Sequence, residues 1–301
     1  MGRILSAIDI GSNTVHLLVG EVNVDGVRKI QDSSEWLSLG EMVGRDRIIS
    51  PALQQQLVLT LNTFKQLASE NGAEGVYVFA TEAIRKSSNS KEVLKLIQKA
   101  TGLTVDVVSG RREAELGLRG ALLDTRSASF LLADVGGGSA QIARCTKKRM
   151  LVEESFPLGT GTLIAKLGLS SPCDYVHQKK IEKTVKEAFE KCEVFGPVQS
   201  VVASGGVARG LWRALHPDGD REIHREEIDY LIWATRRLTV EEIVLRFNVK
   251  TKRASTLLPG AVVYKKILER AGHDTMTISR FSVREGALLE MVDGKVEACP
   301  V

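Results

Sequence analysis

The sequence LADVGGGSAQIA, residues 132–143, places an aspartate before three consecutive glycines and follows them with Ser139 and Gln141. Consecutive glycines lose much backbone entropy on folding and add no side-chain packing, so they need a conformational or steric reason. The close approach of a phosphate to backbone N–H groups is one such reason.

A related stretch occurs in the first part of the chain. IDIGSNT at 8–14 and ADVGGGS at 133–139 both place an aspartate two positions before a glycine and end on Thr or Ser. A strand-like apolar segment precedes each motif and another follows it. We interpret this recurrence as a sign of two related half-chains.

Composition limits the class of protein. The 301 residues include 43% hydrophobic and 26% charged residues, which suffices for two domains of about 100–200 residues each. The net charge of +4 is too small to indicate a nucleic-acid or membrane partner, and no apolar run approaches the roughly 18 residues of a membrane span. The four cysteines form no CxxC pair, which fits a reducing compartment. We therefore expect a cytoplasmic protein without either partner.

The hydrophobic pattern alternates between the periods of strands and helices, which predicts an α/β protein. Strands are expected at 3–10, 15–22, 27–39 (weaker), 75–80, 103–108, 128–135, 139–145, 149–156, 200–204 and 275–279. Helices are expected at 51–72, 91–102, 112–123, 173–193, 224–247, 255–271 and 284–292.

Each glycine motif carries a carboxylate at the end of its first strand, Asp9 or Asp134. A carboxylate beside a phosphate is repelled unless a cation lies between them, and Mg²⁺ typically binds through one or two carboxylates, water and phosphate oxygens. The pair therefore indicates a divalent metal site. The alternative is that both aspartates only cap glycine-rich turns through local hydrogen bonds.

With these motifs the chain resembles the exopolyphosphatase and guanosine pentaphosphatase family, within the superfamily of actin, hexokinase and chaperone ATPases. The resemblance runs nearly end to end. Its further segments, in this order, are FATEAIR at 79–85, VSGRREAEL at 108–116, PLGTGT at 157–162, ASGGVARGL at 203–211, RASTLLPGA at 253–261 and SVREGALLEM at 282–291.

The resemblance implies an α/β fold of two actin-like (ribonuclease H-like) domains, with mixed β-sheets flanked by helices and the active site in the cleft between the domains. The domains would be 1–124 with a C-terminal helix at about 284–301, and 125–283. The implied activity is a phosphoanhydride hydrolase, an exopolyphosphatase that removes the terminal phosphate of inorganic polyphosphate with Mg²⁺ or Mn²⁺.

The resemblance also implies roles for single residues. Glu113 matches the catalytic glutamate that activates water, Arg85 the arginine that contacts substrate phosphate, and Asp134 the metal-associated aspartate, with Asp9 as its counterpart. The phosphate-binding residues are those of the two motifs, Gly11, Ser12, Asn13, Thr14, Gly136, Gly137, Gly138 and Ser139. From the residues alone, Glu113 in the first turn of a helix could also serve only to offset the helix dipole.

Several positions depart from the family pattern. Gln141 stands where a glutamate is usual, so an acceptor oxygen is kept but a negative charge is lost. Arg112 replaces an acidic residue before Glu113, which would attract a polyanion and lower the pKa of that glutamate. Arg253 and Arg284 remain as candidate polyanion contacts around the site, or are surface ion-pair partners.

Two alternatives to an exopolyphosphatase stay open. One is a hydrolase for the terminal phosphate of guanosine pentaphosphate, in which Gly205 and Gly206 would allow close approach of a nucleoside; these glycines could equally serve strand-to-helix packing. The other is a polyphosphate or alarmone sensor without turnover, which Gln141 and Arg112 would favour. A homodimer also remains open.

Overall fold

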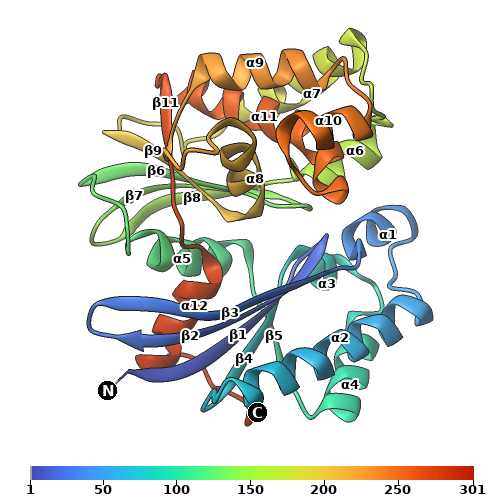
Figure 1. Cartoon of the computed structure of the whole chain (residues 1–301), viewed down its shortest axis with the longest axis vertical. Coiled ribbons are helices and arrows are strands. Elements are labelled where there is room, and N and C mark those ends of the chain that lie inside the picture. Colours follow the sequence, from blue (N-terminus) through green and yellow to red (C-terminus); the bar gives the residue numbers. More distant parts are fainter. Residues whose placement is uncertain (1) are drawn as a thin grey trace. The chain divides into compact units, whose positions relative to one another are not determined.

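The computed structural model describes residues 2–301 as two units (Figure 1). The first unit combines the chain up to Leu123 with Phe281–Val301, and the second is Asp124–Arg280. Each unit has one mixed β-sheet with helices packed against it, which is the predicted fold class.

The first unit contains a five-stranded sheet in the order β3-β2-β1-β4-β5. Its strands are β1 Arg3–Ile10, β2 Thr14–Asn23, β3 Gly26–Trp36, β4 Val76–Ala80 and β5 Val105–Val107. The three strands β1 to β3 are antiparallel, whereas β4 and β5 run parallel to β1. The ends of β1, β4 and β5 therefore lie at the same edge of the sheet.

Helices cover both faces of this sheet. They are α1 Leu39–Asp46, α2 Pro51–Glu70, α3 Glu82–Lys86, α4 Ser90–Thr101, α5 Gly110–Ala121 and α12 Val283–Val292. Leu61 of α2 and Ile97 of α4 pack with Ile8 on one face, whereas Leu116 of α5 and Leu288 of α12 share the core of the other face. The apolar spacing of these helices thus matches a sheet that is buried on both sides.

The pair α5 and α12 joins the end of the chain to the first unit (Figure 1). A Cβ atom on Gly286 would lie 1.9 Å from the carbonyl oxygen of Leu116, and one on Gly120 would lie 2.0 Å from that of Ser282. Glycine is therefore required at both positions for the two helix backbones to approach this closely.

The second unit contains a six-stranded sheet in the order β10-β11-β9-β6-β7-β8. Its strands are β6 Ser129–Val135, β7 Ala140–Thr146, β8 Met150–Phe156, β9 Ser200–Ser204, β10 Glu222–His224 and β11 Thr275–Ile278. β6 to β8 are antiparallel, and β9 and β11 extend the sheet parallel to β6. Apart from the added β10, this repeats the pattern of the first sheet, as two related half-chains require.

The helices of the second unit share one large core with its sheet. They are α6 Thr160–Leu167, α7 Tyr175–Phe189, α8 Gly205–Leu215, α9 Arg225–Thr235, α10 Val240–Phe247 and α11 Thr251–Ala271. Leu131 and Ala133 of β6 belong to this core together with the fully buried Tyr264 of α11. The hydroxyl of Tyr264 binds backbone groups near the ends of β6 and β9.

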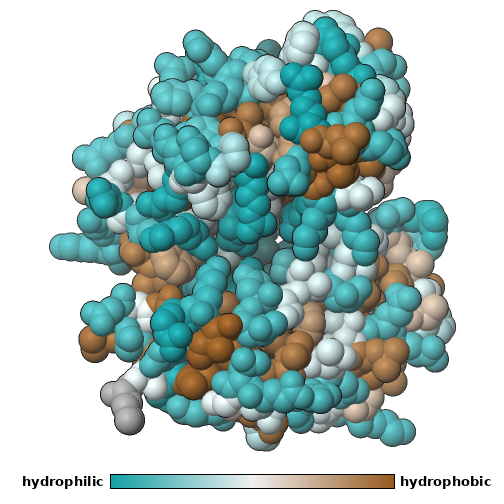
Figure 2. Space-filling model, in the orientation of Figure 1, coloured by the Kyte–Doolittle hydropathy of each residue, from teal (hydrophilic) through white to brown (hydrophobic). Residues whose placement is uncertain are grey.

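Some elements were not expected from the sequence, namely α1, α3, α6, α8 and β10. The helix predicted over 224–247 is two helices, because Thr239 begins α10 with a capping box that includes Glu242. Figure 2 shows a surface that is mainly hydrophilic, with small hydrophobic patches such as one over α10. Among residues 2–301 we find no helix with the length and apolar character needed to cross a bilayer.

Candidate active site

The glycine loop of the second unit connects β6 to β7 and packs against the start of α6. The N–H groups of Thr160 and Gly161 donate to the carbonyl oxygens of Gly136 and Gly137 at 3.0 and 2.8 Å, and the Thr162 hydroxyl donates to Gly138 at 2.7 Å. The first N–H groups of a helix have no partner within that helix, so α6 and the loop satisfy each other.

Because the carbonyl groups of the loop face α6, the N–H groups of the same peptide units point away from this helix. Within residues 2–301, the N–H groups of Gly137, Gly138 and Ser139 donate no hydrogen bond to the protein. Successive N–H groups that point the same way form a concave site for an anion. The predicted phosphate-binding residues of the second unit therefore have the backbone arrangement that this role needs.

The close packing of loop and helix explains a glycine outside the motif. A Cβ atom on Gly159 would lie 2.3 Å from the carbonyl carbon of Gly138, a distance that requires the backbone to move. Gly159 precedes the first turn of α6. It is part of the PLGTGT segment, and its role in shaping the loop was not evident from the sequence.

The loop of the first unit follows the same plan. The carbonyl oxygen of Asn13 accepts from Leu37 and Ser38, both at 3.0 Å, and that of Ser12 accepts from Gly40 at 2.7 Å. Gly40 lies in the first turn of α1, and Leu37 and Ser38 directly precede this helix. The N–H groups of Ser12 and Asn13 make no hydrogen bond to another residue of the described chain 2–301.

Asp134 lies at the end of β6, beside the start of α8. The hydroxyl of Ser204 donates to its Oδ2 at 2.9 Å. A Cβ atom on Gly205 would lie 2.1 Å from its Oδ1, and Gly205 has a positive φ of 83°. Only glycine suits a residue with both constraints, so this glycine makes room for the carboxylate.

The negative charge of Asp134 also affects the pKa of Tyr264. Burial raises the pKa of the Tyr264 hydroxyl well above its ordinary value, and the negative charge of Asp134 raises it further. Tyr264 therefore stays neutral and supports the backbone of β6 and β9 by hydrogen bonding.

Asp9 occupies the equivalent position in the first unit. It is the penultimate residue of β1, opposite His16 of β2 and Phe79 of β4. Asp134 is likewise penultimate in β6, opposite Gln141 of β7 and Ser204 of β9. The two aspartates are thus matched in register, as the sequence motif predicts.

These aspartates can contribute oxygen ligands to a divalent cation but do not form a complete site. Among residues 2–301 there is no group of three or more His, Cys, Asp or Glu side chains that could hold a metal. Mg²⁺ commonly keeps several waters and is bound through one or two carboxylates plus substrate phosphates. The carboxylate of Asp134, held by Ser204 and next to the glycine loop, fits this kind of donor set.

Arg85 and Glu113 lie at the edge of the first sheet where β1, β4 and β5 end. Arg85 is on α3, directly after β4, and its Nη1 donates to the carbonyl oxygen of Val108 at 2.5 Å. Val108 leads into α5, whose first turn carries Glu113. The structure therefore brings the predicted arginine and the predicted base to one end of the sheet that also bears Asp9.

The entrance of α5 is well ordered by local contacts. The hydroxyl of Ser109 accepts from the N–H of Arg112 at 3.1 Å, which makes Ser109 the N-cap. The guanidinium of Arg112 binds the carboxylate of Glu290 on α12. Glu290 therefore offsets the positive charge that the sequence placed beside Glu113, a partner that sequence reasoning missed.

Gln141 is 4% exposed and uses its amide as a donor. Its Nε2 donates to the hydroxyl of Ser139 at 2.7 Å and to that of Ser155 at 3.4 Å. A glutamate could only accept from these hydroxyls. The amide thus fixes the orientation of Ser139, the last residue of the loop.

The remaining predicted residues lie in different surroundings. The guanidinium of Arg253 approaches Gly206, where a Cβ atom would meet its Nη atoms at 3.2 Å, so Gly205, Gly206 and Arg253 lie together around the start of α8. Arg284 is 3% exposed in the first unit and donates to Asp32 at 3.0 Å. Although burial opposes its charged form, the carboxylates of Glu285, Asp32 and Asp9 hold the pKa of Arg284 above its ordinary value.

Comparison with solved structures supports the fold. The structure matches an exopolyphosphatase from Cytophaga hutchinsonii with a TM-score of 0.87 at 22% identity, covering 97% of this chain and 98% of that one. It matches the Aquifex aeolicus member of the Ppx/GppA family with a TM-score of 0.84 at 24% identity, covering 98% and 99%. The predicted actin-like two-domain fold is confirmed.

Comparison of sequences identifies the family. Exopolyphosphatase 1 of Mycobacterium leprae is 26% identical over 310 residues, covering 97% of this chain and 91% of the relative. The sequence profile of the Ppx/GppA phosphatase family matches residues 19–295. The predicted enzyme class, a phosphoanhydride hydrolase, is confirmed at the level of the family. The chain therefore belongs to the Ppx/GppA phosphatase family.

Proposed function

We propose that this chain is an exopolyphosphatase that releases orthophosphate from the end of inorganic polyphosphate. The observation that carries the proposal is the glycine loop of the second unit, which turns three N–H groups without a protein acceptor away from α6, next to the carboxylate of Asp134. A polyanion made only of phosphoryl groups suits a site built from backbone donors.

In the proposed reaction a water molecule attacks the terminal phosphorus and the P–O bond to the next phosphoryl group breaks. Glu113 accepts a proton from the water, and the shortened polyphosphate leaves as the anion. Arg85 can donate two parallel hydrogen bonds to phosphoryl oxygens, which binds the charge that spreads over them in the transition state. Catalysis then depends mainly on positioning and electrostatic stabilisation.

Asp134 would hold a divalent cation, Mg²⁺ or Mn²⁺, and Asp9 is its counterpart in the first unit. When bound, the cation would neutralise phosphoryl charge and polarise phosphoryl oxygens. Ser204 keeps the Asp134 carboxylate in place for this role through its hydrogen bond of 2.9 Å. The first unit carries the proposed base and arginine, and each unit has loop N–H groups that can bind phosphate.

A second candidate substrate is guanosine pentaphosphate. Gly205, Gly206 and the guanidinium of Arg253 lie together at the start of α8, and a planar guanidinium can stack on a nucleobase or bind phosphate. The same terminal hydrolysis would apply. We favour polyphosphate because this cluster has no aromatic residue to stack a base.

The decisive experiment measures the initial rate of orthophosphate release by the full chain from long-chain polyphosphate and from guanosine pentaphosphate. Both reactions are run with Mg²⁺, with Mn²⁺ and with a chelator. We expect a higher kcat/KM for polyphosphate and no release with the chelator. A higher kcat/KM for guanosine pentaphosphate would show that this nucleotide, and not polyphosphate, is the preferred substrate.

The same assay tests a sensor without turnover. Tight binding of polyphosphate with no orthophosphate release under any metal condition would contradict the hydrolase and favour the sensor. The ion pair between Arg112 and Glu290 weakens the case for a sensor, because the charge beside Glu113 is largely compensated.

A further inference from the structure

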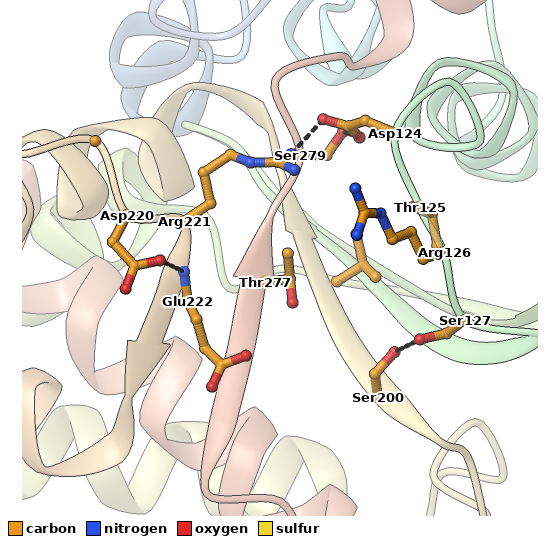
Figure 3. A pocket seen from close by; sticks show the side chains of 12 residues that line it. Asp124, Thr125, Arg126, Ser127, Ser200, Asp220, Arg221, Glu222, Thr277 and Ser279 are labelled. Carbon is orange, nitrogen blue, oxygen red and sulfur yellow. Dashed lines mark hydrogen bonds and ion pairs between the residues drawn. The ribbon is translucent and has the colours of Figure 1, made fainter.

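A polar pocket of about 420 Å³ lies in the second unit, apart from the residues described above (Figure 3). Its volume is in the range of small-molecule sites, which is roughly 300–1,000 Å³. Its lining comes from the segment 124–127, from β9, from the loop and strand around β10, and from β11. The segments 124–127 and 277–280 are the first and last parts of this unit.

One part of the wall is a fixed ion pair. The Nη1 of Arg221 donates to Oδ2 of Asp124 at 2.6 Å, and the hydroxyl of Ser279 donates to the other carboxylate oxygen at 2.8 Å. The side chain of Asp124 is 6% exposed. This buried carboxylate ties the two ends of the unit together and holds the guanidinium of Arg221 at the pocket wall.

Arg126 is a second guanidinium in the same wall. Figure 3 shows its side chain extending from the segment after Asp124 toward the centre of the pocket, on the same side as the guanidinium of Arg221. Within the described chain, residues 2–301, no carboxylate pairs with Arg126. A fork of donors without a carboxylate partner is suited to bind an anion such as a phosphate group.

The other walls offer hydroxyl groups and carboxylates. Ser200 donates to Ser127 at 2.7 Å, and Thr277 of β11 stands between this pair and the acidic side chains of Asp220 and Glu222 (Figure 3). Hydroxyls can both donate and accept, and carboxylates accept. This combination suits a ligand with several hydroxyl groups next to its anionic group. No aromatic side chain lines the pocket to stack on a base.

We propose that this pocket binds a small phosphorylated polyol, of the chemical class of the sugar phosphates. The phosphate would bind Arg126 and the outer N–H groups of Arg221, and the sugar hydroxyls would bind Thr277, Asp220 and Glu222. Because Asp124 and Ser279 lie at the two ends of the unit, the ligand also contacts both segments that lead to the first unit along the chain.

The test uses calorimetric titration of the full chain with glucose 6-phosphate and with ribose 5-phosphate. Glucose and orthophosphate are the reference ligands. We expect at least one sugar phosphate to bind with roughly tenfold higher affinity than either reference ligand. Only a sugar phosphate can bind both the arginines, through its phosphate, and the hydroxyl and carboxylate groups, through its sugar. Absence of binding by both sugar phosphates at millimolar concentration would overturn the proposal, and so would equal binding by orthophosphate.

Arg126→Ala should weaken this binding at least about tenfold. The matched control is Arg149→Ala, which removes another exposed arginine without an ion pair in the same unit, in the turn between β7 and β8. The control should bind like the unmodified chain. Unchanged binding by Arg126→Ala would place the sugar phosphate elsewhere, for example on a glycine loop, and would overturn the proposal.

Hydrogen exchange gives a readout that does not depend on enzymatic activity. Binding in the pocket should slow exchange in the segments 124–127 and 277–280 and should leave the glycine loop at 136–139 unchanged. Slower exchange at 136–139 alone would contradict the pocket as the site. Failure of these tests would not affect the proposed hydrolase, which is measured separately.

Discussion

The two glycine loops share a backbone plan and differ in their side chains. In both units, carbonyl groups of the loop accept hydrogen bonds from N–H groups at the start of a helix, α1 or α6, or directly before it. The first loop carries side chains at Ser12 and Asn13, where the second has Gly137 and Gly138. The second site is therefore formed more completely from backbone.

The contact between loop and helix is also tighter in the second unit. A Cβ atom on Gly159 would lie 2.3 Å from the backbone of Gly138, whereas one on Gly40 would lie 2.7 Å from the Cβ atom of Ser12. The Cβ atom of Ser12 moves only with its backbone, so an added methyl group would displace either loop, and the shorter contact at Gly159 requires the larger shift. The comparison teaches that one motif can be supported with different tolerance for change.

The residues predicted to take part in the reaction also differ between the two units. Arg85 and Glu113 lie at the sheet edge of the first unit. Asp134, with Ser204 and Gly205, lies beside the all-glycine loop of the second. Under the proposed function, the base and the arginine come from the first unit, and the second unit carries Asp134 and the loop formed entirely of glycines. Substitutions in each unit should then have different signatures.

The largest expected effect is that of Glu113→Gln in the first unit. The amide keeps the size of the side chain but cannot accept the proton, so the rate of orthophosphate release should fall by roughly 10²–10⁴-fold. Polyphosphate affinity, measured by calorimetry, should stay nearly unchanged. The control Glu115→Gln alters a carboxylate of the same helix that pairs with Arg111 at 3.2 Å, and it should keep full activity. Equal loss in both variants would remove Glu113 from the proposed mechanism.

The next effect compares Gly159→Ala with Gly40→Ala. The first should lower the free energy of unfolding by ~1–3 kcal/mol, because the added methyl group requires the loop backbone to shift. The second should cost less, because its shortest contact is 2.7 Å instead of 2.3 Å and alanine favours the helix. Denaturant unfolding followed by circular dichroism measures both changes.

Polyphosphate binding should also weaken in Gly159→Ala, because the loop that offers its N–H groups is displaced. Gly210→Ala is the matched control on α8, where a Cβ atom would meet nothing within 4 Å. It should stabilise the chain slightly, by about 0.5–1 kcal/mol. Equal stability of Gly159→Ala and Gly40→Ala would contradict the difference between the loops.

Asp134→Asn should weaken the binding of the divalent cation by the second unit. The amide still accepts the hydrogen bond from Ser204, but it carries no charge to attract a divalent cation. We expect the Mg²⁺ concentration for half-maximal rate to rise by about tenfold. Titration of Mg²⁺ in the orthophosphate-release assay measures this value, and an unchanged half-maximal concentration would exclude Asp134 as a ligand.

The sequence was sufficient to predict the strands that carry the site. β1 and β6 are bounded by the Asp-x-Gly motifs, so their ends and the positions of Asp9 and Asp134 followed directly from the residues. The short helices α1 and α6 were not predicted. Their first N–H groups are satisfied by the loops, a tertiary contact that leaves no periodic signal in a segment of eight residues.

Other parts of the site depended on residues far apart in the sequence. Glu290 reaches Arg112 only because α12 packs against α5. Ser204, which donates a hydrogen bond to Asp134, comes from the neighbouring strand β9. Both contacts are set by the order of strands and helices in the folded units. The sequence therefore predicts candidate reactive groups but not the groups that orient them.

The smallest expected effect is that of Gln141→Glu, which places a carboxylate opposite Asp134 in the register of β6 and β7. The residue is 4% exposed, so without metal the new charge is poorly solvated and should lower the thermal midpoint. With Mg²⁺ the same charge should be compensated, and the metal concentration for half-maximal rate should fall about threefold. The hydroxyls of Ser139 and Ser155 can turn to donate to the new acceptor, so their hydrogen bonds need not be lost. Thermal unfolding of the unmodified chain and of Gln141→Glu, each with and without Mg²⁺, measures the change in the thermal midpoint. Gln141→Leu serves as a control variant without a charge or a hydrogen-bond donor. An Mg²⁺-induced rise in the midpoint no larger for Gln141→Glu than for Gln141→Leu would show that this position does not face the metal, and the metal site would then depend on the aspartates alone.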